Sequence, residues 1–408
     1  MPPVFTGVIF HWLGGLASGS FYVPYKAVRK WSWEVYWLAG GFFSWIIAPW
    51  VMALLLAKGV VPSITTVLHT NPSAVGYAYL FGVLWGIGGL TFGLTMRYLG
   101  MSLGMAVALG LCTVLGTLMP DIFKGTLISN LQTQAPYAVI ILGLGVCLLG
   151  VILAGVAGMS KEREMPEEQK KEAVKEFNFG KGVFIALVSG LFSACMAFGL
   201  QAAEPIAVVA KELGTGDLWV GLPKLCVVLL GGFTTNFIWC MLLMLKNKTM
   251  YQFWNTTIDD PDNKGEKVKI NYAWNLFFSA LAGTTWYFQF FFYSMGETRM
   301  GEYQFSSWTL HMASIIIFSS LWGLCLHEWK GSSRFTKFIL GVAIFTLIYS
   351  TIIVGYGNLM KQVNGEEASA DEAAAATVEE AAADALEAVG DVLDAPVQAL
   401  EAEAVPAN

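Results

Sequence analysis

Residues 136–157 read PYAVIILGLGVCLLGVILAGVA, and this stretch decides the class of fold. It contains no charged residue, and it is long enough to cross the hydrocarbon core of a bilayer, which takes about 20 residues of helix. Nine other apolar runs are comparable in length and composition. The ten predicted spans are residues 4–25, 34–57, 74–96, 101–120, 136–157, 182–203, 218–245, 271–294, 303–326 and 336–357. The sequence therefore predicts an all-α polytopic membrane protein that works inside the bilayer.

The overall composition agrees with a membrane protein. Only 13% of the residues are charged and 55% are hydrophobic, whereas a soluble protein carries about 25% charged residues. All six cysteines lie in the apolar runs and none forms a CxxC pair, so we expect buried free thiols and neither disulfides nor a metal site. No motif indicates a cofactor or binding to nucleic acid.

Lys and Arg residues are distributed unevenly over the segments that connect the predicted spans. Eighteen of them lie in the loops between spans 1–2, 3–4, 5–6, 7–8 and 9–10, and only five lie in the other loops and the termini. Because positively charged loops stay in the cytoplasm, both termini are expected on the non-cytoplasmic side of the membrane. No Lys or Arg precedes the first apolar run, so we do not expect a cleavable signal peptide.

A short sequence recurs at the start of each half of the chain. GVIFHWLGGLAS at residues 7–18 is similar to GVFIALVSGLFS at residues 182–193, which pairs span 1 with span 6. Five spans per half is an odd number, so the second half has to be inverted, as in many transporters whose site lies where the repeats meet. We expect two five-helix repeats, residues 1–157 and 182–360, joined by a charged cytoplasmic linker, residues 158–181.

Three polar segments lie outside the predicted spans. Residues 161–181 mix Glu and Lys and predict a short solvated helix. Residues 246–270 include DDPDNKG at 259–265, whose spacing differs from that of a calcium-binding EF-hand loop, so a plain polar turn is expected. Residues 361–408 form an Ala-rich tail with twelve carboxylates, which predicts a disordered appendage.

Predicted span 8 carries a polar face. Six residues follow each other along one side of the helix, at helical spacing. They are Asn275, Ser279, Ala282, Trp286, Gln289 and Tyr293. Buried amides need partners inside a membrane, so this face points into the bundle. It either lines a path for a sugar or another solute, with Trp stacking on the apolar face of a sugar, or joins helices by hydrogen bonds worth about 0.6 kcal/mol each on average.

Predicted spans 9 and 1 have polar positions of the same kind. Gln304, Trp308 and His311 share one side of span 9, and span 1 contributes His11. In the predicted orientation these residues and Gln289 lie at a similar depth, in the outer half or near the middle, as a single site requires. The candidate substrate-binding residues are Asn275, Trp286, Gln289, Tyr293, Gln304, Trp308 and His311.

The carboxylates all lie at or beyond the ends of the predicted spans, since burying one at the centre costs roughly 2.5–3.5 kcal/mol. A proton-coupled mechanism therefore has few candidate groups. They are His311 and His11, because histidine changes its charge near neutral pH, and Glu302 at the predicted outer mouth. Lys224 follows Pro223 near the start of span 7 and is expected to extend outward to water.

One motif of hydrolases occurs by letter. Residues 100–104 read GMSLG and match GxSxG, but that motif requires a strand–turn–helix setting and a catalytic triad. Here it opens a predicted membrane helix, so we expect no enzymatic activity.

Longer motifs give the sequence a family resemblance. They are KWSWE at residues 30–34, SWII at 44–47, LWGIG at 84–88, GLTMRYLGMS at 93–102, GTLM at 116–119, WYFQFFFY at 286–293 and SWTLHM at 307–312. Over about residues 7–357 the chain resembles the L-rhamnose–proton symporters of the drug/metabolite transporter superfamily. His11, Asn236 and Asn275 also stand at positions similar to that family's.

The resemblance implies a carrier in the cell inner membrane, with ten helices in two inverted halves. It also implies import of L-rhamnose or a related 6-deoxyhexose with a proton by alternating access. The chain departs from the family pattern at Gln304, where the family has Asp, and at Glu302, Glu204 and Lys224. A uniporter or a sodium-coupled carrier of another sugar or small metabolite stays open as an alternative. A non-transporting membrane sensor or scaffold is less favoured, because no folded soluble module is visible.

Overall fold

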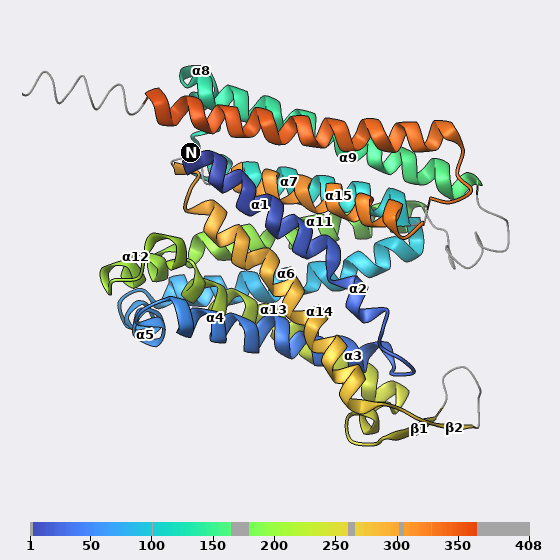
Figure 1. The fold of residues 1–408 in the computed structure, drawn as a ribbon. Helices are drawn as coiled ribbons and strands as arrows, with labels where there is room; N and C mark the ends of the chain where they lie inside the picture. Colours follow the sequence, from blue (N-terminus) through green and yellow to red (C-terminus); the bar gives the residue numbers. More distant parts are fainter. Residues whose placement is uncertain are drawn as a thin grey trace, which may run out of the picture. The chain divides into compact units, whose positions relative to one another are not determined.

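The computed structural model describes residues 3–99, 101–164, 179–259, 266–301, 306–327 and 329–364, and these residues are almost entirely helical (Figure 1). Up to Glu164 the elements are α1 (Pro3–Ser20), α2 (Tyr22–Tyr25), α3 (Trp33–Gly41), the π-helical turn η1 (Phe42–Ile47), α4 (Ala48–Leu56), α5 (Val60–Thr70), α6 (Pro72–Leu99), α7 (Met101–Lys124), α8 (Leu127–Thr133) and α9 (Ala135–Glu164). They continue with α11 (Phe179–Ala202), α12 (Glu204–Glu212), the 3-10 turn η2 (Asp217–Trp219), α13 (Leu222–Asn247), the 3-10 turn η3 (Met250–Phe253), strands β1 (Thr257–Asp259) and β2 (Lys267–Lys269), α14 (Tyr272–Glu297), α15 (Ser306–Cys325) and a last helix, Arg334–Asn364. The chain divides into the units Met1–Asn358 and Leu359–Asn408, and the second is described only to residue 364.

Eight helical stretches of the described chain are long and apolar enough to cross a membrane, and the bent pair of α7 and α8 would be a ninth. Helix α14 has the length of a span, with 26 residues, but it is not one of the eight. Its aromatic, amide and hydroxyl side chains lower its mean hydropathy, and several of them form the polar face predicted for span 8. The helical class is confirmed, whereas the count of ten spans stays a prediction.

A widened turn interrupts the continuous helix formed by α3, η1 and α4. There the N–H of Ala48 bonds the carbonyl of Phe43, five residues back. Pro49 explains the wide turn, because it has no N–H and its ring would clash with the carbonyl of Trp45 in a regular α-helix. Ser44 and Trp45, both inside η1, are buried, and they line a cavity described below.

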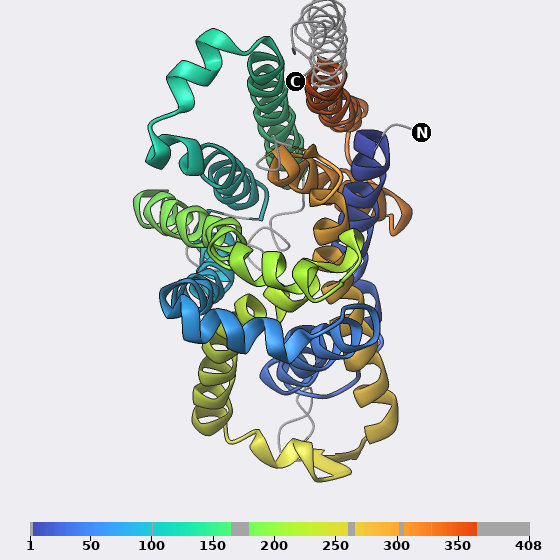
Figure 2. The same cartoon turned by 90° about the vertical axis from the view of Figure 1, so that its left-hand side faces the viewer.

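The long helices cross in two similar sets. Helix α11 packs along α6 and α7, and helix α1 packs along α14 and α15. Helix α6 also packs on α13, and α14 packs on α3 and η1. Figures 1 and 2 show that α12 and the N-terminus lie at one end of this bundle, while the β1–β2 hairpin lies at the other. We call these the α12 end and the hairpin end.

Glycines bring two helix pairs into backbone contact. A Cβ on Gly283 of α14 would overlap the carbonyl oxygen of Gly40 in α3. A Cβ on Gly82 of α6 would overlap the carbonyl oxygen of Val228 in α13. Small residues allow such close approach of helices within a membrane, so these two crossings fix where α6 and α14 stand relative to their neighbours.

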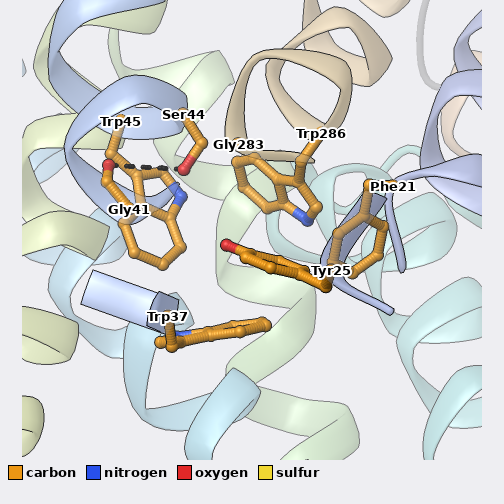
Figure 3. A pocket seen from close by; sticks show the side chains of 8 residues that line it. All are labelled: Phe21, Tyr25, Trp37, Gly41, Ser44, Trp45, Gly283 and Trp286. Carbon is orange, nitrogen blue, oxygen red and sulfur yellow. Dashed lines mark hydrogen bonds between the residues drawn. The ribbon is translucent and has the colours of Figure 1, made fainter. Parts of the chain in front are cut away.

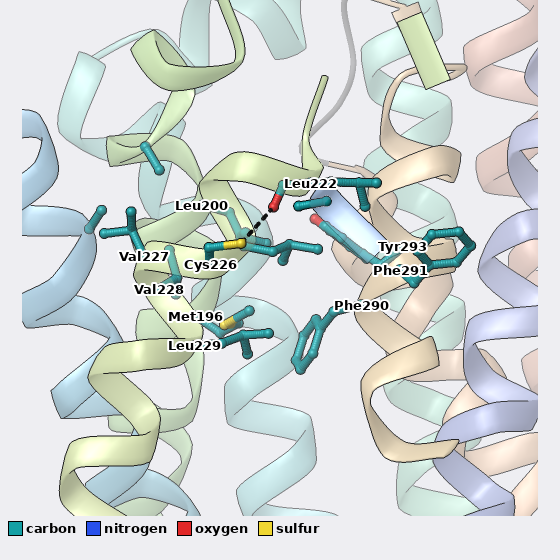
Figure 4. Packing of buried hydrophobic residues seen from close by; sticks show 14 of the residues in the cluster. Met196, Leu200, Leu222, Cys226, Val227, Val228, Leu229, Phe290, Phe291 and Tyr293 are labelled. Atoms are coloured by element: carbon teal, nitrogen blue, oxygen red, sulfur yellow. Dashed lines mark hydrogen bonds between the residues drawn. The ribbon is translucent and has the colours of Figure 1, made fainter. Parts of the chain in front are cut away.

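The largest group of buried apolar side chains lies around α13 (Figure 4). It includes Met196 and Leu200 from α11, Leu229 from α13, and Phe290 and Phe291 from α14. These side chains join the helices of the first set to α14. This apolar group lies on a side of α14 next to its polar face.

Two short helices and a hairpin were not predicted from the sequence. Helices α5 and α12 lie in segments expected to be loops, and they pack on each other at the α12 end. They are too short to give a spanning signal, and their burial rests on a few positions such as Val67 and Ile206. Two short antiparallel strands flank the segment expected to be a plain polar turn, with Ile258 opposite Val268. Ile258 is buried, which explains why these strands order.

The six cysteines are free, as predicted. Five are buried, but Cys325, at the end of α15, is exposed, so the expectation of burial was wrong for that residue. Helix α9 extends to Glu164, which places the first charges of the predicted linker in its last turns. Residues 165–178, residues 260–265 and the acidic tail from residue 365 lie outside the described residues, and their predictions stay predictions.

Candidate functional site

A cavity with aromatic walls lies between α2, α3, η1 and α14 (Figure 3). Its lining residues are Phe21, Tyr25, Trp37, Gly41, Ser44, Trp45, Gly283 and Trp286. The free space inside is about 10 Å³, which is about the room that one water molecule requires. A monosaccharide therefore does not fit until the surrounding side chains or helices move.

The aromatic rings of this cavity pack against each other in pairs. Tyr25 stacks on Trp37 with ring centroids 5.8 Å apart, as Figure 3 shows. Trp286 meets Trp45 edge-on at 5.4 Å, and it lies 5.7 Å from Trp85 of α6. Such rings combine broad apolar faces with N–H and O–H groups at their edges. They can therefore contact both the apolar face and the hydroxyls of a sugar.

His11 of α1, Tyr293 of α14 and His311 of α15 meet in the interior. The Tyr293 ring lies 5.3 Å from the His11 ring and 5.2 Å from the His311 ring, centroid to centroid. Both histidines are fully buried. None of their four ring nitrogens has a hydrogen-bond partner in the part of the chain that the structure describes. We call these three residues the histidine cluster.

Further buried polar groups without a partner among the described residues lie on α14 and α15, the helices that carry Tyr293 and His311. The amide nitrogen of Gln289, one turn before Tyr293, is buried without a partner among the described residues, as is the hydroxyl of Ser307. Helix α1 also approaches closely here, because a Cβ on Gly14 would lie 2.8 Å from the backbone carbonyl oxygen of Gln289 and 3.4 Å from the His311 ring. Leaving such groups unpaired costs about 1–3 kcal/mol each. A ligand rich in hydroxyl groups would supply the missing partners.

Five of the predicted residues converge in this region. Gln289, Tyr293 and His311 stand together with His11, and the ring of Trp308 lies 5.9 Å from that of Tyr293. The indole N–H of Trp308 donates a hydrogen bond to the carbonyl of Cys112 at 3.1 Å, so its orientation is fixed. The convergence comes from the crossing of α1 with α14 and α15. Trp286, two turns before Tyr293 on α14, belongs to the aromatic cavity.

Asn275 lies apart from the other predicted residues, in the first turns of α14. Its amide oxygen accepts a hydrogen bond from the Arg29 N–H at 3.0 Å, and its amide nitrogen donates one to the Arg29 carbonyl at 2.9 Å. The neighbouring Trp274 donates its indole N–H to the carbonyl of Ala27 at 3.0 Å. Asn275 therefore joins α14 to the segment between α2 and α3. Gln304 and Glu302 lie outside the described residues.

The sequence led us to expect that Lys224 extends outward to water, but the structure shows it buried. It is 3% exposed, and its Nζ lies 2.8 Å from the carboxylates of both Glu204 and Glu297. A cavity of about 290 Å³ at the α12 end reaches all three residues. The sequence showed each charge near the end of a different span, but not that the three ends meet.

Comparison with known proteins agrees with this architecture. Residues 2–360 match the family described as L-rhamnose-proton symport protein (RhaT). The L-rhamnose-proton symporter of Yersinia pestis (strain Pestoides F) is 36% identical over 360 residues, which cover 87% of this chain and 98% of the relative. The L-rhamnose-proton symporter of Salmonella typhi is 36% identical over 353 residues, which cover 86% of this chain and 97% of the relative. This chain belongs to the L-rhamnose-proton symport protein family.

Proposed function

We propose that this chain carries L-rhamnose, or a related 6-deoxyhexose, into the cell together with a proton. The observation that carries the proposal is the histidine cluster, whose buried imidazole nitrogens have no hydrogen-bond partner among the described residues, one helical turn of α14 from Gln289. The family supports the choice of substrate, because relatives that match over nearly their whole length are named L-rhamnose-proton symporters.

The proposed sugar site consists of Trp286, Gln289, Tyr293, Trp308 and His311. Gln289 and His311 offer donors and acceptors to hydroxyl groups, and the indole and phenol rings offer apolar faces. L-Rhamnose has a methyl group where an ordinary hexose has a hydroxymethyl group, and the aromatic cavity beside Trp286 suits that methyl. Gln304 remains a proposed contact from the residues before α15. Asn275 is reassigned to the contact with Arg29, because both ends of its amide are engaged there.

We further propose that the carrier has ten spans in two inverted repeats, residues 1–157 and 182–360. Two kinds of observation support this. The pairing of α1 with α14 and α15 has a counterpart in the pairing of α11 with α6 and α7. A Gly-x-x-Trp sequence also occurs in both α6 and α14, with Gly82 and Gly283 at backbone crossings and Trp85 and Trp286 in contact at 5.7 Å.

The small size of the aromatic cavity supports alternating access, because a sugar does not fit there without rearrangement. A sugar has to enter by movement of α14 relative to α3 and α13, and the cavity at the α12 end offers the approach from that side. The hairpin end is held by hydrogen bonds between distant segments, including Arg29 with Asn275 and Ser32 with Gln252. The distribution of Lys and Arg supports the assignment of the hairpin end to the cytoplasm of a cell with an inner membrane, and of both termini to the opposite side.

Transport in proteoliposomes tests this function. The purified full chain should accumulate labelled L-rhamnose when the outside is acidic, and a protonophore should abolish the accumulation. A sodium gradient alone should have no effect. L-Mannose is the matched competitor, because it differs from L-rhamnose only by a hydroxyl on C6, and it should compete poorly. Absence of L-rhamnose uptake, or uptake that ignores the protonophore, would contradict the proposal.

A further inference from the structure

Lys224 and its two carboxylate partners form an ion triad at the α12 end. The Lys224 side chain is 4% exposed, whereas Glu297 is 14% and Glu204 46% exposed. Each residue comes from a different helix, with Glu204 at the start of α12, Lys224 at the start of α13 and Glu297 at the end of α14. We call these three residues the Lys224 triad.

The Lys224 triad carries one more negative than positive charge when all three groups are ionised. Water can solvate the half-exposed Glu204, whereas Glu297 is largely shielded from water, so the excess negative charge is less favourable when Glu297 carries it. One proton makes the group neutral without breaking both contacts of Lys224. The triad is therefore matched in charge to the uptake of a single proton.

Other charged groups at the α12 end form no ion pair with the Lys224 triad among the described residues. Lys211 of α12 pairs with Asp217 of η2 at 3.2 Å, and both side chains are mostly exposed. Arg299, after the end of α14, lines the same cavity of about 290 Å³ without an ion pair to Glu297 among the described residues. Towards the interior the titratable neighbours are Tyr293 of α14 and the two histidines of the histidine cluster. Water in the cavity can reach the carboxylates of the triad from the α12 end.

The Lys224 triad adjoins the histidine cluster directly. Glu297 follows Tyr293 by one turn of α14, and Tyr293 contacts both His11 and His311. Between them, Gly296 lies so close to His11 that a Cβ there would be 2.7 Å from the imidazole. Glu297 therefore lies about one helical turn from Tyr293 of the proposed sugar site.

We propose that Glu297 is the carboxylate that takes up the co-transported proton, an inference that rests on the proposed symport function. The Glu297 carboxylate accepts one proton from water in the cavity at the α12 end and becomes a neutral acid, while Lys224 stays paired with Glu204. After the carrier has changed its access, the same proton passes to water on the other side and the carboxylate is restored. Glu297 is chosen over Glu204 because it has less water around it and because α14 also carries Trp286 and Gln289.

The test compares three measurements on the same proteoliposomes. They are accumulation of L-rhamnose driven by a pH gradient, alkalinisation of the medium when sugar is added, and exchange of labelled for unlabelled L-rhamnose with no gradient. Glu297→Gln should lose accumulation and sugar-induced alkalinisation of the medium, but keep exchange, because exchange needs no net proton movement. Asp217→Asn, a carboxylate-to-amide change in the same cavity, should keep all three.

The outcomes separate this inference from the proposed function. If the unaltered chain shows no proton-driven uptake, the proposed function fails. If the unaltered chain accumulates sugar and Glu297→Gln does so equally, or if only Glu204→Gln loses accumulation, the role of Glu297 is wrong. Glu297→Asp keeps a carboxylate and should retain accumulation with a shifted pH profile. If both Glu297 variants lose exchange as well, the triad has only a structural role and the inference is overturned.

Discussion

The side-chain amide of Asn275 pairs with both the N–H and the carbonyl of Arg29, at 3.0 and 2.9 Å. These two residues are 246 positions apart, and the pair of hydrogen bonds joins the start of α14 to the segment between α2 and α3. The contact lies at the hairpin end, which has to open for sugar release if access alternates. Asn275 therefore joins α14, the helix that carries much of the proposed site, to a segment that closes the hairpin end.

Replacing Asn275 by Ala should lower stability more than sugar affinity. Both Arg29 backbone groups would lose their partner, at a cost of about 1–3 kcal/mol for each group left unsatisfied. The thermal midpoint in detergent should fall, while the half-saturation concentration for L-rhamnose should change little. The exposed Asn255, replaced by Ala, serves as control. A large rise in the half-saturation concentration with an unchanged thermal midpoint would instead show that Asn275 contacts the sugar.

Replacing Gly283 by Ala should disrupt the crossing of α14 with α3. The added Cβ would overlap the carbonyl oxygen of Gly40, and such overpacking typically costs about 1–3 kcal/mol. Gly76 of α6 is the matched control, because nothing lies within 4 Å of a Cβ there. Yield and thermal midpoint should fall for Gly283→Ala and stay constant for Gly76→Ala. Equal behaviour of the two variants would contradict the close crossing.

Much of the fold and part of the site could be predicted from the sequence. Hydropathy gave the helical class, and helical spacing placed Gln289 and Tyr293 on one face of α14. Their common depth with His11 and His311 also predicted the convergence that the structure places around Tyr293. These features depend on local pattern and on depth, both of which a single sequence contains.

Other parts depend on which helix ends meet, and the sequence does not contain that information. The partners of Lys224 lie 20 and 73 residues away, and only the packed helices bring them together. Helices α5 and α12 are too short to give a spanning signal, so they were expected to be loops. The sequence likewise grouped Asn275 with the polar face of α14, but its hydrogen-bond partner is the backbone of Arg29 in a distant segment.

Trp286 should contribute an apolar face to sugar binding. Replacing it by Ala removes the ring that contacts Trp45 and Trp85, and we expect half-saturation to rise by about tenfold or more, which corresponds to about 1.4 kcal/mol. Trp286→Phe keeps an aromatic face, so its half-saturation concentration should lie between those of the unaltered chain and of Trp286→Ala. Trp254→Ala is the control, because that ring is 71% exposed at the hairpin end. An unchanged half-saturation concentration in Trp286→Ala would show that the aromatic cavity is not part of the sugar site.

Gln289 distinguishes a sugar site from simple packing of helices. Its amide nitrogen is buried without a partner among the described residues, so a hydrogen bond to a sugar hydroxyl would be a net gain of about 1 kcal/mol or more. Gln289→Leu keeps the volume but removes the donor, and we expect half-saturation for L-rhamnose to rise by about tenfold.

The control for this change is Gln201→Leu, on an exposed position of α11, which should leave transport unaltered. The thermal midpoint of Gln289→Leu should stay constant or rise, because an unpaired buried donor has been removed. If instead the midpoint falls and the half-saturation concentration does not move, the amide joins helices to each other. The polar face of α14 would then be a packing feature, and the sugar would have to bind at the cavity next to Lys224.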